Sequence, residues 1–321
     1  MRIVGIDELT FGVKDLALAQ RFFTDWGLNP LSSVEGQLEF ETLNGAKVRL
    51  IDGTVEGFAP GVEPDPTVRE VVWGVADASS FVALKQRLQS QPTYFDHGER
   101  VGCSDPSGLR LAFQVSVKKT LNLPVPATNN WSSRARVDQR APQYERAQPV
   151  DIGHVVFFVK DLNATRDFYM ETLGFVLSDA YPDRGAFLRC EPRGGHHDLF
   201  LLQLPQPRQG LNHVAFTVRD HHEVFGGGMH MSRQGWTTEL GPGRHPISSA
   251  IFWYFESPAG GLIEYYADED ELTEAWTPRS FTPGPTMFAE WAITGGIDGN
   301  TRRQTQAQAP TGQFLTDKPK P

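Results

Sequence analysis

Residues 6–16 read IDELTFGVKDL and residues 152–162 read IGHVVFFVKDL, so one motif occurs twice in the chain. Each copy places a polar residue ahead of an apolar, strand-like run and ends on Val-Lys-Asp-Leu. The polar residue is Glu8 in the first copy and His154 in the second. The chain therefore carries an internal duplication in which the frame is kept and the residue best able to bind a metal is changed.

The likeness between the two copies continues beyond the motif. A segment with helical spacing follows each copy, ALAQRFFTDWGLNPL in the first and NATRDFYMETLGFVL in the second, and Gly27 and Gly174 are expected to end these helices. Short strand-like runs come next, QLEFETL and AKVRLID in the first half and GAFLRC and DLFLLQL in the second. The start of the unit then recurs at REVVWGVADASSFVALKQRL and at LNHVAFTVRDHHEVFGGGM.

These repeats predict an α+β fold made of four βαβββ modules. A single module cannot close its own core, so we expect the modules to pair into two domains, each an open, incomplete β-barrel flanked by helices. The predicted organisation is an N-terminal domain over residues 1–119, a connector rich in Pro, Asn, Arg and Gln over 120–149, a C-terminal domain over 150–293, and a polar tail over 294–321.

The composition suits a globular protein, with 39% hydrophobic and 21% charged residues. No apolar run approaches the ~20 residues that cross a bilayer, so no membrane partner is expected. The net charge of −9 argues against nucleic acid, which binds clustered Lys and Arg. Cys103 and Cys190 lie outside any CxxC spacing, which favours a reducing, cytoplasmic location over a disulfide framework or a zinc–thiolate site.

Three positions of the repeat carry metal-binding chemistry in one half only. Aligning the halves pairs Glu8 with His154, Glu70 with His213, and Ala112 with Glu264. A single histidine at the start of a strand is usually a surface residue, but a carboxylate in the apolar run LIEYY costs several kcal/mol unless it is paired or bound to a metal. Two imidazoles and one carboxylate in one cavity form the facial triad of non-haem Fe(II) proteins. We therefore predict a metal site in the second half.

Residues 150–267 resemble the catalytic half of the type I extradiol ring-cleavage dioxygenases, in the vicinal oxygen chelate superfamily with its glyoxalase-like fold. The first half resembles their non-catalytic N-terminal domain, so the likeness covers roughly residues 3–290. The resemblance implies that His154, His213 and Glu264 bind Fe(II), with Mn(II) as an alternative. It further implies that a catechol and O2 are the substrates. We also expect a homo-oligomer.

Three further residues match the acid–base and hydrogen-bonding groups of that family. They are His197 in GGHHDLFLL, His245 in GPGRHPISS and Tyr254 in FWYFESPAGG. The resemblance implies that His197 transfers the proton of the second catechol hydroxyl, because imidazole titrates near neutral pH. It implies that Tyr254 and His245 hydrogen-bond the substrate oxygen. His196 is expected to be structural, because strand alternation aims it away from His197.

Departures from the family pattern bear on the substrate. Leu240 stands where members that take carboxylated catechols often have an arginine, and Phe187, Phe252 and Trp253 suggest an apolar pocket. We therefore expect an uncharged catechol, either bicyclic or alkylated. The glycine run FGGGMHM at 225–231 has no explanation in the sequence.

Two other classes of protein stay open. One is another metalloenzyme of the superfamily, a glyoxalase or a resistance enzyme using Mn, Ni or Zn, which would lack the His197–His245–Tyr254 set. The other is a metal-free binding protein of the bleomycin-resistance type, which needs no triad. Metal content together with oxygen uptake on catechol would separate all three.

Overall fold

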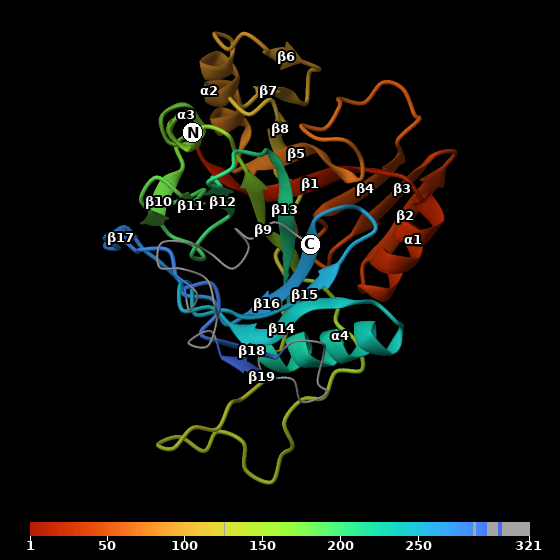
Figure 1. The fold of residues 1–321 in the computed structure, drawn as a ribbon, viewed down its shortest axis with the longest axis vertical. Helices are drawn as coiled ribbons and strands as arrows, with labels where there is room; N and C mark the ends of the chain where they lie inside the picture. Colours follow the sequence, from red (N-terminus) through yellow and green to blue (C-terminus); the bar gives the residue numbers. More distant parts are fainter. Residues whose placement is uncertain (125, 285–286, 294–300, 304–321) are drawn as a thin grey trace.

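The protein is described by a computed structural model that covers residues 1–124, 126–284 and 287–293, together with the backbone of 301–303. Two sheets make up the molecule, one from each half of the chain (Figure 1). Neither sheet closes on itself within these residues, and helices flank both. The predicted α+β fold of open sheets is confirmed. None of the described helices is long and apolar enough to cross a bilayer.

The first half contains two modules. The first consists of β1 (Ile3–Val13), α1 (Leu16–Asp25), β2 (Asn29–Val34), β3 (Gln37–Glu41) and β4 (Lys47–Asp52). The second consists of β5 (Thr67–Val75), α2 (Ala78–Leu88), β6 (Phe95–Asp96), β7 (Val101–Ser104) and β8 (Arg110–Val115). The strand order β2-β3-β4-β1-β5-β8-β7-β6 joins the modules through antiparallel pairing of β1 and β5.

The second half repeats this plan. Its third module consists of β9 (Asp151–Phe158), α3 (Leu162–Asp167), the π-helix η1 (Phe168–Leu173), β10 (Val176–Tyr181), β11 (Gly185–Arg189) and β12 (Leu199–Leu202). The fourth consists of β13 (Gly210–Thr217), α4 (His221–Arg233), β14 (Thr238–Arg244), β15 (Ile251–Glu256) and β16 (Leu262–Ala267). Antiparallel pairing of β9 and β13 joins the modules, with the order β10-β11-β12-β9-β13-β16-β15-β14.

An aspartate begins the first helix of every module, which explains part of the repeated motif. The side chain of each accepts a hydrogen bond from the backbone N–H three residues later, and these caps are Asp15, Asp77, Asp161 and Asp220. The predicted helix ends at Gly27 and Gly174 have φ angles of 95° and 83°, which favour glycine. The Val-Lys-Asp-Leu motif is thus a strand end followed by a helix cap.

The two halves share one continuous hydrophobic core. Trp26, which caps α1 in the first half, stacks on Tyr265 of β16 with ring centroids 3.5 Å apart, and the Tyr265 hydroxyl donates to the Trp26 carbonyl at 2.6 Å. Phe216 and Phe255 contact the same indole edge-on. The sequence had indicated that each pair of modules forms a separate core. The structure instead has an aromatic cluster that contains residues of both halves.

The segments outside the modules are irregular or short. The described residues between β8 and β9 form no helix or strand, and Figure 1 shows this yellow-green segment as a long excursion. Three short strands were not predicted: β17 (Arg279–Ser280), β18 (Trp291–Ile293) and β19 (Thr301–Arg303). β17 pairs with β10, and β18 lies between β14 and β19. The rest of the predicted polar tail over 294–321 lies outside the described residues.

The glycine run in α4 is explained by close packing on three neighbours. A Cβ on Gly226 would overlap the backbone of Tyr144, and one on Gly227 would lie 2.6 Å from the Cβ of Ala147. A Cβ on Gly228 would overlap the indole ring of Trp253, which is fully buried. The run therefore lets α4 approach both the connector and β15.

We expect Gly228→Ala to destabilise the fold. The added methyl group forces the Trp253 ring to move, and overpacking of this kind costs about 1–3 kcal/mol. The higher helix propensity of alanine offsets up to about 1 kcal/mol of that cost. Urea unfolding measures the difference, with Met229→Ala on the exposed side of α4 as control. Equal or greater stability of Gly228→Ala would contradict the packing explanation.

Candidate metal centre

Strand register places the three predicted ligands on one face of the second sheet. Ala215 of β13 pairs with His154 of β9 on one side and with Glu264 of β16 on the other. His213 lies two residues before Ala215, so its side chain emerges on the same face. The predicted ligands thus surround one small alanine at the junction of the two modules.

The three side chains meet at one point. The Nε2 atoms of His154 and His213 lie 3.3 Å apart, and each lies 3.3 Å from Oε2 of Glu264. Corners of such a triangle lie about 1.9 Å from its centre, close to the metal–nitrogen and metal–oxygen bond lengths of about 2.0–2.2 Å. One ion just above the triangle could therefore contact all three atoms. All three residues are buried.

The three candidate ligands include a buried carboxylate without hydrogen-bond partners, which is expected of a metal site. Glu264 is fully buried, and neither of its carboxylate oxygens has a partner at hydrogen-bonding geometry. Burial would raise the pKa of Glu264, but the imidazoles of His154, His213 and His245 hold it well below its usual range. Burial lowers the pKa of His154 to about 4. An ionised carboxylate beside a neutral imidazole is the protonation state that a divalent cation requires.

A second cluster, not found from the sequence, shares one of these ligands. His154, His197 and Glu269 also have potential donor atoms within 4.8 Å of one another. Burial raises the pKa of Glu269 well above its usual range, with a further contribution from Asp198. A protonated carboxyl is a poor metal ligand, so the arrangement favours the Glu264 triad. The sequence analysis did not single out Glu269, because no motif or repeat position marks it.

His245 and Tyr254, which the sequence singled out, border the triad. The Tyr254 hydroxyl lies 3.1 Å from Nε2 of His245, and that nitrogen lies 3.5 Å from Oε1 of Glu264. Nδ1 of His245 lies 2.6 Å from the Phe288 carbonyl, which orients the ring. Tyr254 pairs directly with Glu264 across β15 and β16. Both polar side chains therefore face the candidate metal position.

His197 lies on the opposite flank of the triad. Its ring packs against His154 with centroids 4.1 Å apart, and it precedes β12. Burial, followed by the neighbouring histidines, lowers the pKa of His197 well below its usual range. A neutral imidazole next to the candidate ligands can accept a proton from a bound substrate. All six residues singled out in the sequence are thus brought together.

The apolar surroundings differ in part from those expected. Phe187 packs edge-on against His197 at 5.1 Å, and Phe252 stacks on His245 at 4.1 Å, so both border the site. Trp253 points the other way, because neighbouring residues of a strand face opposite sides of the sheet, and it packs on α4. The interpretation of Trp253 as a pocket residue is therefore wrong.

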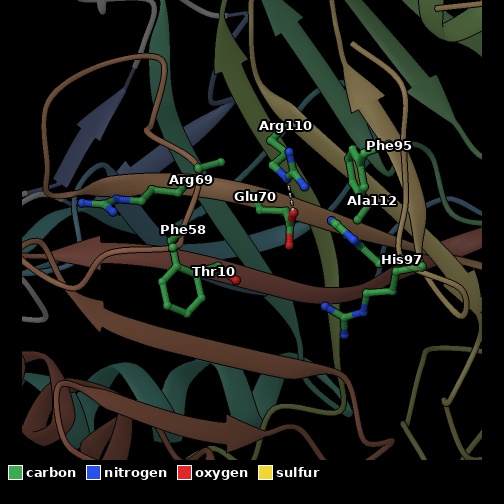
Figure 2. Close-up of a pocket in the computed structure, with 11 residues that line it drawn as sticks. Thr10, Phe58, Arg69, Glu70, Phe95, His97, Arg110 and Ala112 are labelled. Carbon is green, nitrogen blue, oxygen red and sulfur yellow. Dashed lines mark hydrogen bonds and ion pairs between the residues drawn. The ribbon is translucent and has the colours of Figure 1, made fainter.

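The first half has a cavity of about 390 Å³ that involves the repeat-equivalent positions, with Glu70 and Ala112 in its lining (Figure 2). Val72 pairs with both Glu8 and Ala112, as Ala215 pairs with His154 and Glu264, which supports the alignment of the halves.

Arginines neutralise the two carboxylates at these positions. Figure 2 shows the Arg110 guanidinium beside Glu70, joined at 2.8 Å. Glu8 pairs with Arg100 at 2.6 Å and with Arg49 at 3.4 Å. Two of the three positions equivalent to the candidate ligands therefore hold ion pairs.

We expect the double substitution Glu8→Gln, Glu70→Gln to leave metal content and turnover nearly unchanged. The free energy of unfolding should fall by about 1–3 kcal/mol, because removing one partner of a buried ion pair leaves the other charge uncompensated. Arg100 is partly exposed, and contact with water moderates this loss. Metal analysis and urea unfolding on the same sample measure both effects, with exposed Glu239→Gln as control. A loss of iron in the double variant would show that the roles of the halves had been misassigned.

Comparisons with known proteins agree with the sequence-based resemblance. Residues 151–265 match the family model described as Glyoxalase/Bleomycin resistance protein/Dioxygenase superfamily. "Metapyrocatechase 2" of Cupriavidus necator is 28% identical over 89% of this chain and 88% of that protein. "Biphenyl-2,3-diol 1,2-dioxygenase" of Metapseudomonas furukawaii is 29% identical over 96% of this chain and all of that protein.

Solved structures share the fold along the whole chain. A Mn(II)-bound glyoxalase from Novosphingobium aromaticivorans has a TM-score of 0.72 at 22% identity and covers 99% of both chains. A halotolerant catechol dioxygenase has a TM-score of 0.70 at 17% identity, covering 97% of this chain and 98% of that one. Residues 151–265 are thus similar to the domain of the glyoxalase, bleomycin resistance protein and dioxygenase superfamily. Within it, the resemblance to extradiol catechol dioxygenases is confirmed.

Proposed function

We propose that the protein is an Fe(II)-dependent extradiol dioxygenase, which cleaves the ring of a catechol beside the diol and incorporates O2. The observation that carries this proposal is the buried His154–His213–Glu264 triangle, whose carboxylate has no hydrogen-bond partner. An ion that binds these three atoms leaves coordination positions free on the face that His197, His245 and Tyr254 border. The relatives named as dioxygenases, among them an "Iron-dependent extradiol dioxygenase" of Rhodococcus jostii, support the same reading.

His154, His213 and Glu264 would hold Fe(II), and the same donor set also accepts Mn(II). When bound, the ion supplies a redox-active centre that a catechol can chelate through both oxygens. The chain supplies the surrounding groups in protonation states suited to the reaction. Ionised Glu264 and neutral His154 carry one negative charge to the site, which would offset half of the charge of a divalent ion.

We assign proton transfer to His197. Its imidazole is neutral, buried and packed on the ring of His154, so it can accept the proton of the second catechol hydroxyl and return it later to an oxygen of the opening ring. Tyr254 and His245 already lie 3.1 Å apart, and we assign them to hydrogen bonds with the substrate oxygen on the other flank.

The substrate we propose is an uncharged catechol, bicyclic or alkylated. Two buried apolar clusters adjoin the site, one containing Phe187, Phe158 and Leu202 and the other containing Leu240 and Phe252. A ring substituent placed among these side chains gains from the hydrophobic effect, whereas a carboxylate there would lose hydration.

The domain boundaries, the oligomeric state and the location of the protein in the cell stay predictions. We propose domains over 1–119 and 150–293 joined by a connector over 120–149, because each sheet draws its strands from one half. We propose a homo-oligomer in the cytoplasm, and the buried free thiols of Cys103 and Cys190 suit a reducing compartment.

Oxygen uptake and metal content test the function together. The protein, loaded anaerobically with Fe(II), is mixed with a panel of unsubstituted, alkylated, bicyclic and carboxylated catechols, and ring-fission colour is followed. We expect one Fe(II) per chain, uptake of one O2 per catechol cleaved and a preference for uncharged rings. Metal binding without oxygen uptake on any catechol would favour a glyoxalase-type or resistance-type enzyme. Absence of metal binding would favour a binding protein of the bleomycin-resistance type.

A further inference from the structure

A chain of buried polar groups leads from β17 to the candidate metal centre. Oδ2 of Asp179 lies 2.9 Å from Nε2 of His196, and Nδ1 of His196 lies 3.2 Å from Nδ1 of His197. Asp179 and His196 are fully buried, and His197 is nearly so. His196 is therefore more than the structural residue expected from the sequence, because it joins a carboxylate to the residue assigned to proton transfer.

Arg279 holds the carboxylate at the outer end of this chain in one orientation. Its backbone N–H donates to Oδ1 of Asp179 at 2.8 Å, and its Nη2 donates to Oδ2 at 2.6 Å. Burial would raise the pKa of Asp179, but the hydrogen bonds from His196 and Arg279 hold it below its usual range. Asp179 is thus ionised, and both of its oxygens act only as acceptors.

An acceptor at one end determines where each proton lies along the chain. Because Asp179 accepts from Nε2 of His196, an imidazole with one ring proton carries it on Nε2 and presents a lone pair at Nδ1. The contact between the two Nδ1 atoms then requires the proton to be on His197. A neutral His197 has only one ring proton, so its Nε2 is left as a free lone pair.

We propose that Asp179 and His196 are positioning residues that hold His197 in the Nδ1–H tautomer, with Nε2 available to accept a proton from a substrate. The effect on catalysis rests on the proposed dioxygenase function, whereas the tautomer itself does not. Oε1 of Glu269 lies 3.5 Å from Nδ1 of His197 and forms no hydrogen bond with it. Phe187 packs edge-on against both imidazoles.

The substitution Asp179→Asn reverses the chain of hydrogen bonds. The backbone N–H of Arg279 cannot rotate, so it keeps the amide oxygen on its own side and turns the amide nitrogen toward His196. The Arg279 side chain, whose Nη2 then loses its acceptor, is 43% exposed and can turn to solvent. His196 must then accept at Nε2 and donate from Nδ1. His197 is left with its proton on Nε2, where the substrate hydroxyl would meet a donor instead of a base.

Nitrogen NMR reads this tautomer directly. The 15N-histidine-labelled protein is loaded with Zn(II), which is diamagnetic and binds the same kinds of ligand, and His197→Asn identifies the His197 signals. We expect a protonated Nδ1 and an unprotonated Nε2 in the native protein, with the two exchanged in Asp179→Asn. A native His197 protonated on Nε2, or an unchanged tautomer in folded Asp179→Asn, would overturn the proposal.

Kinetics of the Fe(II)-loaded protein supply the second measurement. We expect Asp179→Asn and His196→Leu to lower kcat by about 10²–10⁴-fold while changing KM little, because the loss concerns a proton transfer and not substrate binding. In serine proteases the comparable Asp→Asn change lowers kcat about 10⁴-fold by giving the wrong tautomer. Unchanged kcat in both variants would overturn the positioning role.

The control variant is Asp105→Asn, which alters a buried carboxylate that hydrogen-bonds Tyr169 at 3.2 Å, away from the site. It should keep the native His197 tautomer and nearly native turnover. This result would separate the effect of Asp179→Asn from that of losing any buried carboxylate. If the native protein showed the expected tautomer, with exchange in Asp179→Asn, but no catechol were cleaved, the proposed function alone would fall.

Discussion

Glu264→Ala is expected to abolish metal binding and turnover while leaving the chain folded. The carboxylate supplies one of three donor atoms held 3.3 Å apart, and no other described side chain occupies that corner of the triangle. Changes in groups that merely support a ligand already reduce metal affinity about 10–100-fold. Loss of the only charged ligand should have a larger effect, at least about 10²-fold.

The stability of the variant provides an independent check. Without a metal, Glu264 is a buried ion whose oxygens lack hydrogen bonds, so replacing it by alanine removes a desolvation cost along with a side chain. The metal-free variant should therefore melt close to the metal-free native protein. The native protein should gain Tm on adding Fe(II), because a ligand that binds only the folded state stabilises it. The variant should gain almost none.

Glu269→Gln is the matched control, because Glu269 belongs to the competing cluster around His154. It should retain one metal ion per chain. If Glu269→Gln emptied the site while Glu264→Ala kept it, the ligand set would have to be redrawn around His197. Full metal occupancy in the His154→Ala, His213→Ala double variant would exclude both clusters.

His197→Ala is expected to keep the metal and lose most of the turnover. The side chain lies beside the triad, packed on His154, and is not one of the three atoms of the triangle. General acid–base groups contribute about 10²–10⁴-fold, and we expect a loss within that range. His197→Asn can still form a hydrogen bond but cannot shuttle a proton near neutral pH, so it should bind catechol better than His197→Phe and turn over as slowly.

Tyr254→Phe is the milder comparison for His197→Ala. It removes one hydrogen bond, to His245 at 3.1 Å, and a neutral hydrogen bond contributes about 0.5–1.5 kcal/mol, or roughly tenfold at most. Iron content and turnover are measured in the same sample for every variant. Loss of iron in His197→Ala would make His197 a ligand. Native turnover in His197→Ala on the best substrate would remove the acid–base assignment and weaken the case for ring cleavage over a resistance-type function.

The repeat and its helix caps were legible in the sequence because they depend on local chemistry. Strand alternation, aspartate caps such as Asp15 and Asp161, and the left-handed glycines that follow the helices act over a few residues. The metal triad could also be predicted, because the duplication compares His154 and Glu264 with positions of the same frame that lack their chemistry. The duplication therefore allowed a candidate site that forms only in the folded chain to be recognised from the sequence.

The partners of the site residues were decided only by the tertiary structure. Asp179 and Arg279 are 100 residues apart in sequence and reach His196 through the pairing of β10 with β17. Arg100 reaches Glu8 across 92 residues, and no local pattern marks either contact. Hydrogen bonds and ion pairs depend on positions in space that strand order and loop paths set together. The sequence by itself therefore determined the fold and singled out residues that the fold brings together around the candidate metal position. The tertiary structure decided which carboxylate lies beside both histidines without a hydrogen-bond partner, and which groups contact His197.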